Sequence, residues 1–212
     1  FSPFGDITTL MVWQRGFESF FDFFAIFLPS VVNYLIPAAI MYFAIPNEIP
    51  KGDGKKVKIE PGGSVIAILG ILTISITVAG HQVLHMPPVF GMMFGLGMLG
   101  TYGYFLKTRH PGKNKFDIFE LTGKAEWDTL LFFYGILVCV GGLASLGYLK
   151  LISDDMYVTL GATYANILVG ILSAIIDNIP IVYAVLTAHP SMDMGQWLLI
   201  TLTAGVGGSL LS

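Results

Sequence analysis

An acidic residue and an amide interrupt one of the most apolar stretches of this sequence. Residues 173–180 read Ser-Ala-Ile-Ile-Asp-Asn-Ile-Pro, so Asp177 and Asn178 stand among aliphatic side chains. An ionisable side chain at membrane depth is costly and usually functional. Pro180 removes a backbone donor and disfavours helix at the residue before it. We therefore expect a helix to break here and to leave backbone groups beside the carboxylate, as in cation sites of membrane proteins.

Each polar residue of this segment also has a purely structural interpretation. Asp177 could cap the half-helix that follows it, because a carboxylate can accept backbone N–H groups at a helix start. The amide oxygen of Asn178 could coordinate a cation, or the amide could satisfy freed backbone groups. Ser173 lies four residues before Asp177 on the same helix face, and its hydroxyl could instead bond back to its own helix.

A second cluster lies near the start of the chain. Asp6, Thr8 and Thr9 combine one carboxylate and two hydroxyls within a short apolar segment, and hard cations prefer such oxygen ligands. The alternative is a helix start, because Ser2-Pro3 is a good opening for a helix.

Three further residues are candidates for the same kind of site. Ser209 and Ser212 are three residues apart, so in a helix both hydroxyls would reach one ion or one neighbouring helix. Asp128 follows Trp127 at the start of an apolar stretch. A Trp beside acidic residues can equally be an anchor at the membrane interface.

The composition defines the environment in which these residues work. Of the 212 residues, 54% are hydrophobic and 12% charged, and the mean hydropathy is +0.74. Soluble domains carry roughly 25% charged residues, so we predict an all-α polytopic membrane protein that lies in the lipid bilayer. The charges sit in a few short segments, and we expect no nucleic-acid partner and no cofactor. A single cysteine, Cys139, excludes an internal disulfide framework.

Apolar runs of sufficient length predict four full spans, at residues 20–45, 63–79, 89–106 and 128–149. Residues 1–13 are too short to cross a bilayer of about 30 Å alone. We expect residues 150–156 to form a short connection. Residues 157–188 have two interpretations: a helix broken in mid-membrane, or a re-entrant hairpin with its tip at Asp177 and Asn178. Residues 196–212 form a last apolar segment, whose Gly and Ser cluster favours unwinding.

The distribution of basic residues predicts an orientation. If the four spans alternate, the loops at residues 46–62 and 107–127 share one face and hold nine of the eleven Lys and Arg residues. The positive-inside rule makes that face cytoplasmic. Segment 173–180 then enters the membrane from outside.

Several of these strings together resemble one family. SPFGDITT at residues 2–9, EWD at 126–128, SAIIDNIP at 173–180 and GGSLLS at 207–212 are similar to the NhaD-type sodium/proton antiporters of the ion transporter superfamily. The resemblance covers essentially the whole chain. It implies two inverted repeats, each with a re-entrant hairpin followed by a discontinuous helix, and it favours the hairpin interpretation.

The resemblance also implies a domain organisation. Residues 1–14 would be the second half of a broken helix of the first repeat, and residues 15–62 a span and a cytoplasmic loop. Residues 63–212 would hold further spans with the hairpin and broken helix of the second repeat. We expect one membrane domain, incomplete at both ends, as an internal fragment of a longer transporter. Location in a bacterial inner membrane and a homodimer are further expectations from the resemblance.

The function that we predict is secondary transport of cations. A carboxylate at membrane depth holds either a proton or Na⁺ or Li⁺, and alternating exposure of such a site exchanges one for the other. Asp177, Asp6 and Asn178 are the candidate Na⁺ or Li⁺ ligands. Two alternatives remain: a sodium-coupled symporter of an anionic substrate, and an intramembrane aspartyl protease with Asp6 and Asp177 as its dyad. An Asp at the hairpin tip opposes the first, because it would repel an anion.

Overall fold

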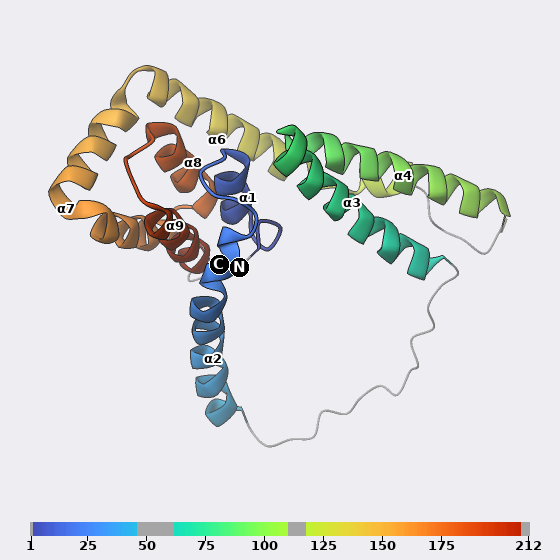
Figure 1. Cartoon of the computed structure of the whole chain (residues 1–212), viewed down its shortest axis with the longest axis horizontal. Coiled ribbons are helices and arrows are strands. Elements are labelled where there is room, and N and C mark those ends of the chain that lie inside the picture. The colour runs from blue at the N-terminus through green and yellow to red at the C-terminus, as the bar shows by residue number, and fades with distance from the viewer. Residues whose placement is uncertain (1, 46–61, 110–117, 209–212) are drawn as a thin grey trace. The chain divides into compact units, whose positions relative to one another are not determined.

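The computed structural model describes residues 2–45, 62–109 and 118–208. Within these ranges the chain forms helices and no strands (Figure 1). It divides into two compact units, and each has its own packing. The first unit comprises Phe1–Ile45 and Trp127–Ser212, and the second comprises Pro46–Glu126.

Five helical segments of the described chain are long and apolar enough to cross a membrane. They are Asp22–Ala44 (η1, Asp22–Ile26, with α2, Phe27–Ala44), α3 (Gly63–Leu84), α4 (Pro88–Arg109), α6 (Trp127–Ser145) and α7 (Tyr148–Ser173). Neither α2 nor α6 has a buried residue, although both are strongly apolar. Exposed apolar faces of this size fit lipid rather than water. The prediction of an all-α multi-pass membrane protein is confirmed.

One predicted boundary is wrong. Residues 150–156 belong to α7, and the connection before it is at Gly147, whose φ of 84° places it in the left-handed region. Lys150 and Asp154 are both exposed and four residues apart, so they share one face of a helix. Charges in this segment therefore mark the polar face of a helix and not a loop.

The helix α7 is broken further along, at Gly161. Gly161 has a φ of 75° and a ψ of 158°, which are not helical values, so it divides α7 into two helical halves. This conformation is readily available only to glycine. The half after Gly161 runs to Ser173, and α8 (Asn178–Ala188) begins five residues later. The two pack together. At 1.5 Å per residue each spans about half of a bilayer. These lengths agree with the re-entrant hairpin, which stays a prediction.

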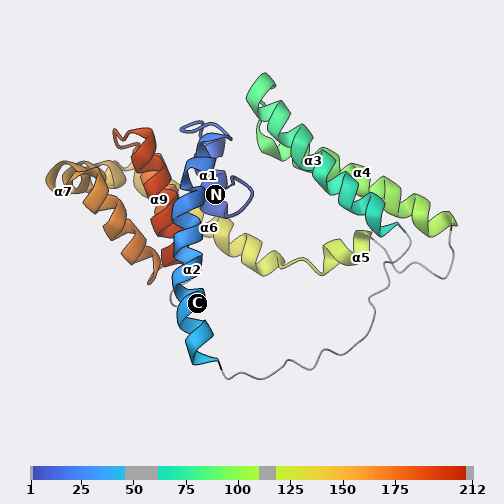
Figure 2. The ribbon, with the colours of Figure 1, turned by 60° about the horizontal axis from the view of Figure 1, so that its bottom comes forward.

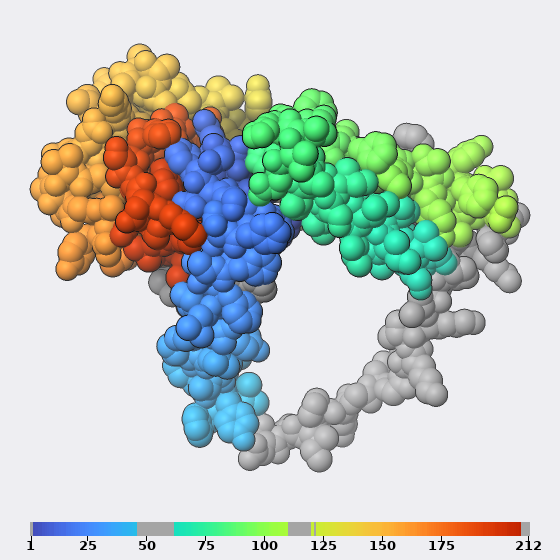
Figure 3. All heavy atoms as spheres, in the orientation of Figure 1, coloured from blue at the N-terminus to red at the C-terminus, as the bar shows by residue number. Residues whose placement is uncertain are grey.

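The core of the first unit is built around α9 (Met194–Gly207). Figures 1 and 2 show α9 between α7 on one side and α1 (Ile7–Gln14) on the other. The same order is visible in the atoms of Figure 3, where the red segment separates the orange and the dark blue ones. Trp13, Val182, Ile200 and Ala204 are almost completely buried in this core. The short helices and the second half of α7 therefore form the protected interior, whereas α2 and α6 have no buried residue.

The second unit is a helical pair with a short additional helix, α5 (Ile118–Gly123). Its two long helices, α3 and α4, pack closely because Gly91 and Gly95 lie against Thr77 and Thr73, where no Cβ would fit. Small residues at such contacts allow membrane helices to approach each other.

Candidate functional site

Three helix ends meet in the first unit. The start of α1, the start of α8 and the C-terminal turns of α9 form this meeting point, which we call the crossing. A Cβ placed on Gly205 of α9 would lie 3.1 Å from Asp6 Oδ2, and one on Gly208 would lie 3.1 Å from Asn178 Cγ. Two of the predicted site residues, from sequence positions far apart, therefore lie against one face of α9.

The start of α1 fixes the Asp6 cluster. Asp6 is the N-cap of α1, and its Oδ2 accepts hydrogen bonds from Thr8 N (3.3 Å) and from the Thr8 hydroxyl. The Thr8 hydroxyl also lies 3.4 Å from the carbonyl oxygen of Thr201 in α9. Thr9 donates to the carbonyl oxygens of Ser2 (2.9 Å) and Asp6 (2.7 Å). Both threonines are buried, so their hydroxyls hold the helix start in place beside α9.

The start of α8 repeats this arrangement. Asp177 is the N-cap of α8, and its Oδ1 accepts a hydrogen bond from Ile179 N at 3.4 Å. Asp177 therefore caps α8, as the structural interpretation of the sequence predicts. Asp6 and Asp177 are both exposed, and the second oxygen of each carboxylate has no hydrogen-bond partner among the described residues. Capping leaves each of them an oxygen for a cation.

Ser173 and Asn178 connect the hairpin to α9. The Ser173 hydroxyl is buried and donates to the carbonyl oxygen of Ala204 at 2.8 Å, so it crosses to α9 and does not bond back to its own helix. Asn178 is half-buried, with its amide against Gly208. Both residues lie at the crossing.

The remaining predicted residues are not brought to the crossing by any described contact. Asp128 is exposed in the first turn of α6, and no hydrogen bond or ion pair joins it to another candidate within the described ranges. Ser209 and Ser212 lie outside the described residues.

The crossing brings together the positive ends of two helix dipoles, those of α1 and α8, and the negative end of a third, that of α9. The N-termini of α1 and α8 carry partial positive charge, which their Asp caps compensate. The C-terminus of α9 presents carbonyl oxygens with partial negative charge. Carboxylate, amide and carbonyl oxygens are the ligands that hard cations take, so this arrangement could hold a small cation and exchange it for a proton on a carboxylate.

The sequence interpretation missed how α9 takes part in the crossing. Thr201, Gly205 and Gly208 are spaced by four and three residues, which places them on one helix face. That face meets Asp6, Thr8 and Asn178. The spacing was visible in the sequence, but glycine has no side chain that could indicate chemistry.

A buried polar network was missed as well. Asn166, which is completely buried, accepts a hydrogen bond from the Tyr157 hydroxyl (2.8 Å) and donates to the backbone oxygen of Gln196 (3.0 Å). The Gln196 side chain donates in turn to the Thr163 hydroxyl at 2.9 Å. These bonds connect both sides of the Gly161 break to the start of α9. A signal was present, because Asn166 interrupts an apolar run.

Known proteins resemble the whole chain. It is 50% identical to the Na(+)/H(+) antiporter NhaD of Vibrio parahaemolyticus, with 100% of this chain and 57% of that protein aligned. It is 51% identical to the Na(+)/H(+) antiporter NhaD of Alkalimonas amylolytica, over 100% of this chain and 49% of that protein. Sodium/proton antiporter 1 of Arabidopsis thaliana is 31% identical, over 99% of this chain and 38% of its own.

The chain therefore spans about half the length of the curated relatives that it matches. No solved structure matches it. The family model named CitMHS, described as citrate transporter, matches residues 1–205. Because this match covers nearly all of the sequence, the chain belongs to the CitMHS family of transporters.

Proposed function

We propose that the protein containing this chain is a secondary transporter that exchanges Na⁺ or Li⁺ for H⁺, and that the crossing is part of its ion site. The observation that carries the proposal is the placement of Asp6 and Asn178 against one face of the α9 terminus. The names of the relatives at 45% to 51% identity support the same activity.

The proposed mechanism is competition for a carboxylate. Asp6 and Asp177 each keep an oxygen that serves no described hydrogen bond, and either carboxylate can take a proton or contribute to holding a cation. Asn178 would add an amide oxygen and α9 its terminal carbonyls, while Thr8, Thr9 and Ser173 position the three helix ends. Ser209, Ser212 and Asp128 stay candidates for further oxygen ligands.

The two alternatives are not favoured. A citrate-like substrate, as in the description of the family model, would meet two carboxylates at the crossing, and like charges in one site cost several kcal/mol. Relatives at 50% and 51% identity are named antiporters and not proteases or symporters.

A flux measurement tests the proposal. The full-length protein is reconstituted in vesicles with a pH-sensitive dye, and Na⁺ or Li⁺ is added. We expect cation-dependent proton movement that Asp177→Asn abolishes without preventing membrane insertion. The control is Asp155→Asn, which removes an exposed carboxylate on α7 away from the crossing. The absence of any cation-dependent flux from the inserted wild type would rule the proposal out.

Finer features belong to the same proposal. The excess of Lys and Arg in residues 46–62 and 107–127 supports a cytoplasmic location for both loops. The bacterial relatives support a location in a bacterial inner membrane. The two inverted repeats and the homodimer rest on the resemblance to the superfamily.

A further inference from the structure

The helices α1, α8 and α9 have one end at the crossing. Their opposite ends enclose an open pocket of about 510 Å³. It lies where α1 ends, where α8 ends at His189 and where α9 begins after Asp193. The α9 helix has 14 residues, so at 1.5 Å per residue roughly 20 Å separates its two ends. The pocket is therefore distinct from the crossing.

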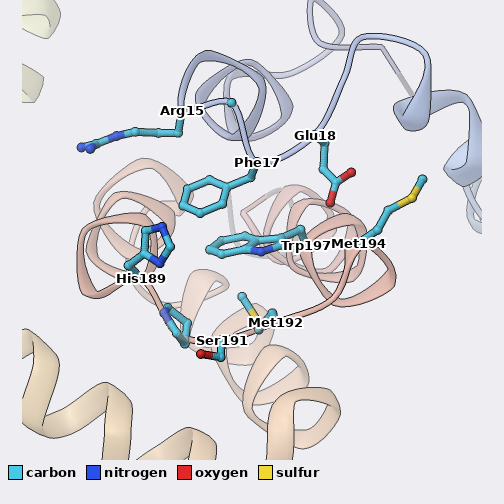
Figure 4. Close-up of a pocket in the computed structure, with 10 residues that line it drawn as sticks. Arg15, Phe17, Glu18, His189, Ser191, Met192, Met194 and Trp197 are labelled. Atoms are coloured by element: carbon cyan, nitrogen blue, oxygen red, sulfur yellow. The ribbon is translucent and has the colours of Figure 1, made fainter.

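Aromatic rings form one wall of the pocket. Phe17 stacks on Trp197 with ring centroids 4.0 Å apart, and His189 lies 4.7 Å from Phe17 (Figure 4). This contact joins the segment after α1 to α9 and to the end of α8. The wall is apolar, so a charge beside it loses part of its hydration.

Glu18 places a carboxylate against this wall. Its side chain is only 9% exposed and lines the pocket, and Figure 4 shows the carboxylate directed between Trp197 and Met194. Among the described residues Glu18 has no hydrogen-bond partner and no ion-pair partner. Its oxygens are not among the fully buried unpaired atoms, so they reach solvent through the open pocket. A carboxylate that has lost most of its hydration and has no partner is stabilised when it binds a cation or a proton.

The charges that face Glu18 increase this cost. Asp22 of η1 and Asp193 at the start of α9 are both close enough to repel it. Their carboxylates already accept backbone N–H groups, of Ser19 at 2.8 Å and of Gln196 at 2.9 Å. Burial first, and then these two neighbours, raise the pKa of Glu18.

The nearby basic groups do not compensate this charge. Arg15 also lines the pocket, but its guanidinium lies 5.6 Å from the centre of the Tyr183 ring. Figure 4 shows its side chain extended away from Glu18. The His189 ring faces Phe17 and not Glu18. Arg15 and His189 line the pocket together with Glu18, but neither forms an ion pair with it among the described residues.

We propose that Glu18 is a second cation-binding site, which takes a small monovalent cation such as Na⁺ or Li⁺, or a proton in its place. The choice of cation rests on the proposed function. A hard cation suits the carboxylate oxygens of Glu18, which line the pocket. An organic ammonium ion is less suited, because the face of Phe17 towards Trp197 is already stacked.

The test separates this site from the crossing by removing the crossing carboxylates. The full-length protein with Asp6→Asn and Asp177→Asn is placed in nanodiscs, and its thermal unfolding midpoint is measured as NaCl replaces choline chloride at constant ionic strength. At about pH 8.5 we expect Na⁺ to raise the midpoint, because the ionised carboxylate gains a partner. At about pH 5 the effect should shrink, because protons compete.

Adding Glu18→Gln to this variant should remove the Na⁺ effect, whereas adding Asp155→Asn should keep it. A midpoint that does not respond to Na⁺, or that responds equally after Glu18→Gln, would overturn the proposal. The measurement needs no transport, so its outcome does not depend on the flux experiment.

A second measurement uses variants with an intact crossing. Addition of NaCl to weakly buffered wild-type protein should release protons, and Glu18→Gln should release fewer. Equal proton release from both proteins would contradict the proposal even if the Asn variants fail to fold.

Discussion

Two aspartates in this chain serve as helix caps and as candidate ion ligands at the same time. Asp6 and Asp177 each accept the N–H group two residues later, which fixes their carboxylates at the starts of α1 and α8. A capping carboxylate is held in place by one oxygen, and the other oxygen stays accessible. The structural and functional interpretations of these residues are therefore compatible.

Gly205 determines how closely Asp6 approaches α9. We predict that Gly205→Ala raises the KM for Na⁺ by about tenfold, equal to about 1.4 kcal/mol, because the new Cβ would lie 3.1 Å from Asp6 Oδ2 and displace the carboxylate. Flux in vesicles at varied Na⁺ concentration measures this. The free energy of unfolding should not fall, since Ala is the better helix former by roughly 0.5–1 kcal/mol.

The matched control is Gly141→Ala in α6, where no atom would lie within 4 Å of the added Cβ. Its KM should equal that of the wild type. An unchanged KM in Gly205→Ala would remove Gly205 from the site.

We predict that Glu18 makes the free energy of unfolding depend on pH when alkali cations are absent. Its pKa is raised in the folded state by burial and by Asp22 and Asp193, so between the unfolded and folded pKa values the folded protein binds more protons. Stability should therefore fall as pH rises through this window. Glu18→Gln should flatten this part of the curve of unfolding midpoint against pH, measured in choline buffer. A wild-type curve that rises through the same window would contradict the burial of this carboxylate.

At the scale of elements, short helices form the site and long helices surround it. The α9 helix uses two faces: Thr201, Gly205 and Gly208 meet α1 and α8, while Ala204 and Gly207 meet α7. Helices shorter than a span end inside the protein, so their caps and terminal carbonyls meet there. Helices that end inside the protein thus place the partial charges of their terminal N–H and C=O groups where an ion could bind.

The break of α7 depends on one residue. Gly161→Ala should destabilise the protein by about 1–3 kcal/mol, because its φ of 75° and ψ of 158° are strained for any residue with a Cβ. The comparison is Gly135→Ala in α6, a regular helical position with open space around it, which should be neutral or slightly stabilising. The unfolding midpoint of the purified protein measures both. No loss of stability in Gly161→Ala would mean that α7 is continuous there.

At the scale of the whole molecule, apolar side chains face outward along the long helices. Phe43 and Tyr42 at the end of α2, and Phe132 and Tyr134 of α6, are largely exposed, although this composition would bury such residues in a soluble protein. Lipid would cover these side chains.

The proposed orientation can be tested by labelling. The native Cys139 is removed by Cys139→Ser, and Lys55→Cys or Lys113→Cys introduces a thiol in either loop. A membrane-impermeant maleimide should label both only in inside-out vesicles, because both loops are proposed to be cytoplasmic. Labelling of the two loops from opposite sides would contradict the alternation of spans.

The sequence by itself determined the class of protein and most of the spans, because hydropathy over about 20 residues depends on composition and not on packing. It also located the polar interruptions, since Asp6, Asp177 and Asn178 are conspicuous among apolar neighbours. It misjudged residues 150–156, whose charges lie on the exposed face of α7.

Only the tertiary structure decided which of the candidates meet. Asp6 and Asn178 are separated by most of the chain, and they come together through Gly205 and Gly208, which have no side chains to mark the contact. Ser173 was ambiguous until its partner proved to be a backbone carbonyl of α9. Hydrophobic patterns set where helices form, whereas close packing of small residues and hydrogen bonds between elements set which helix ends meet.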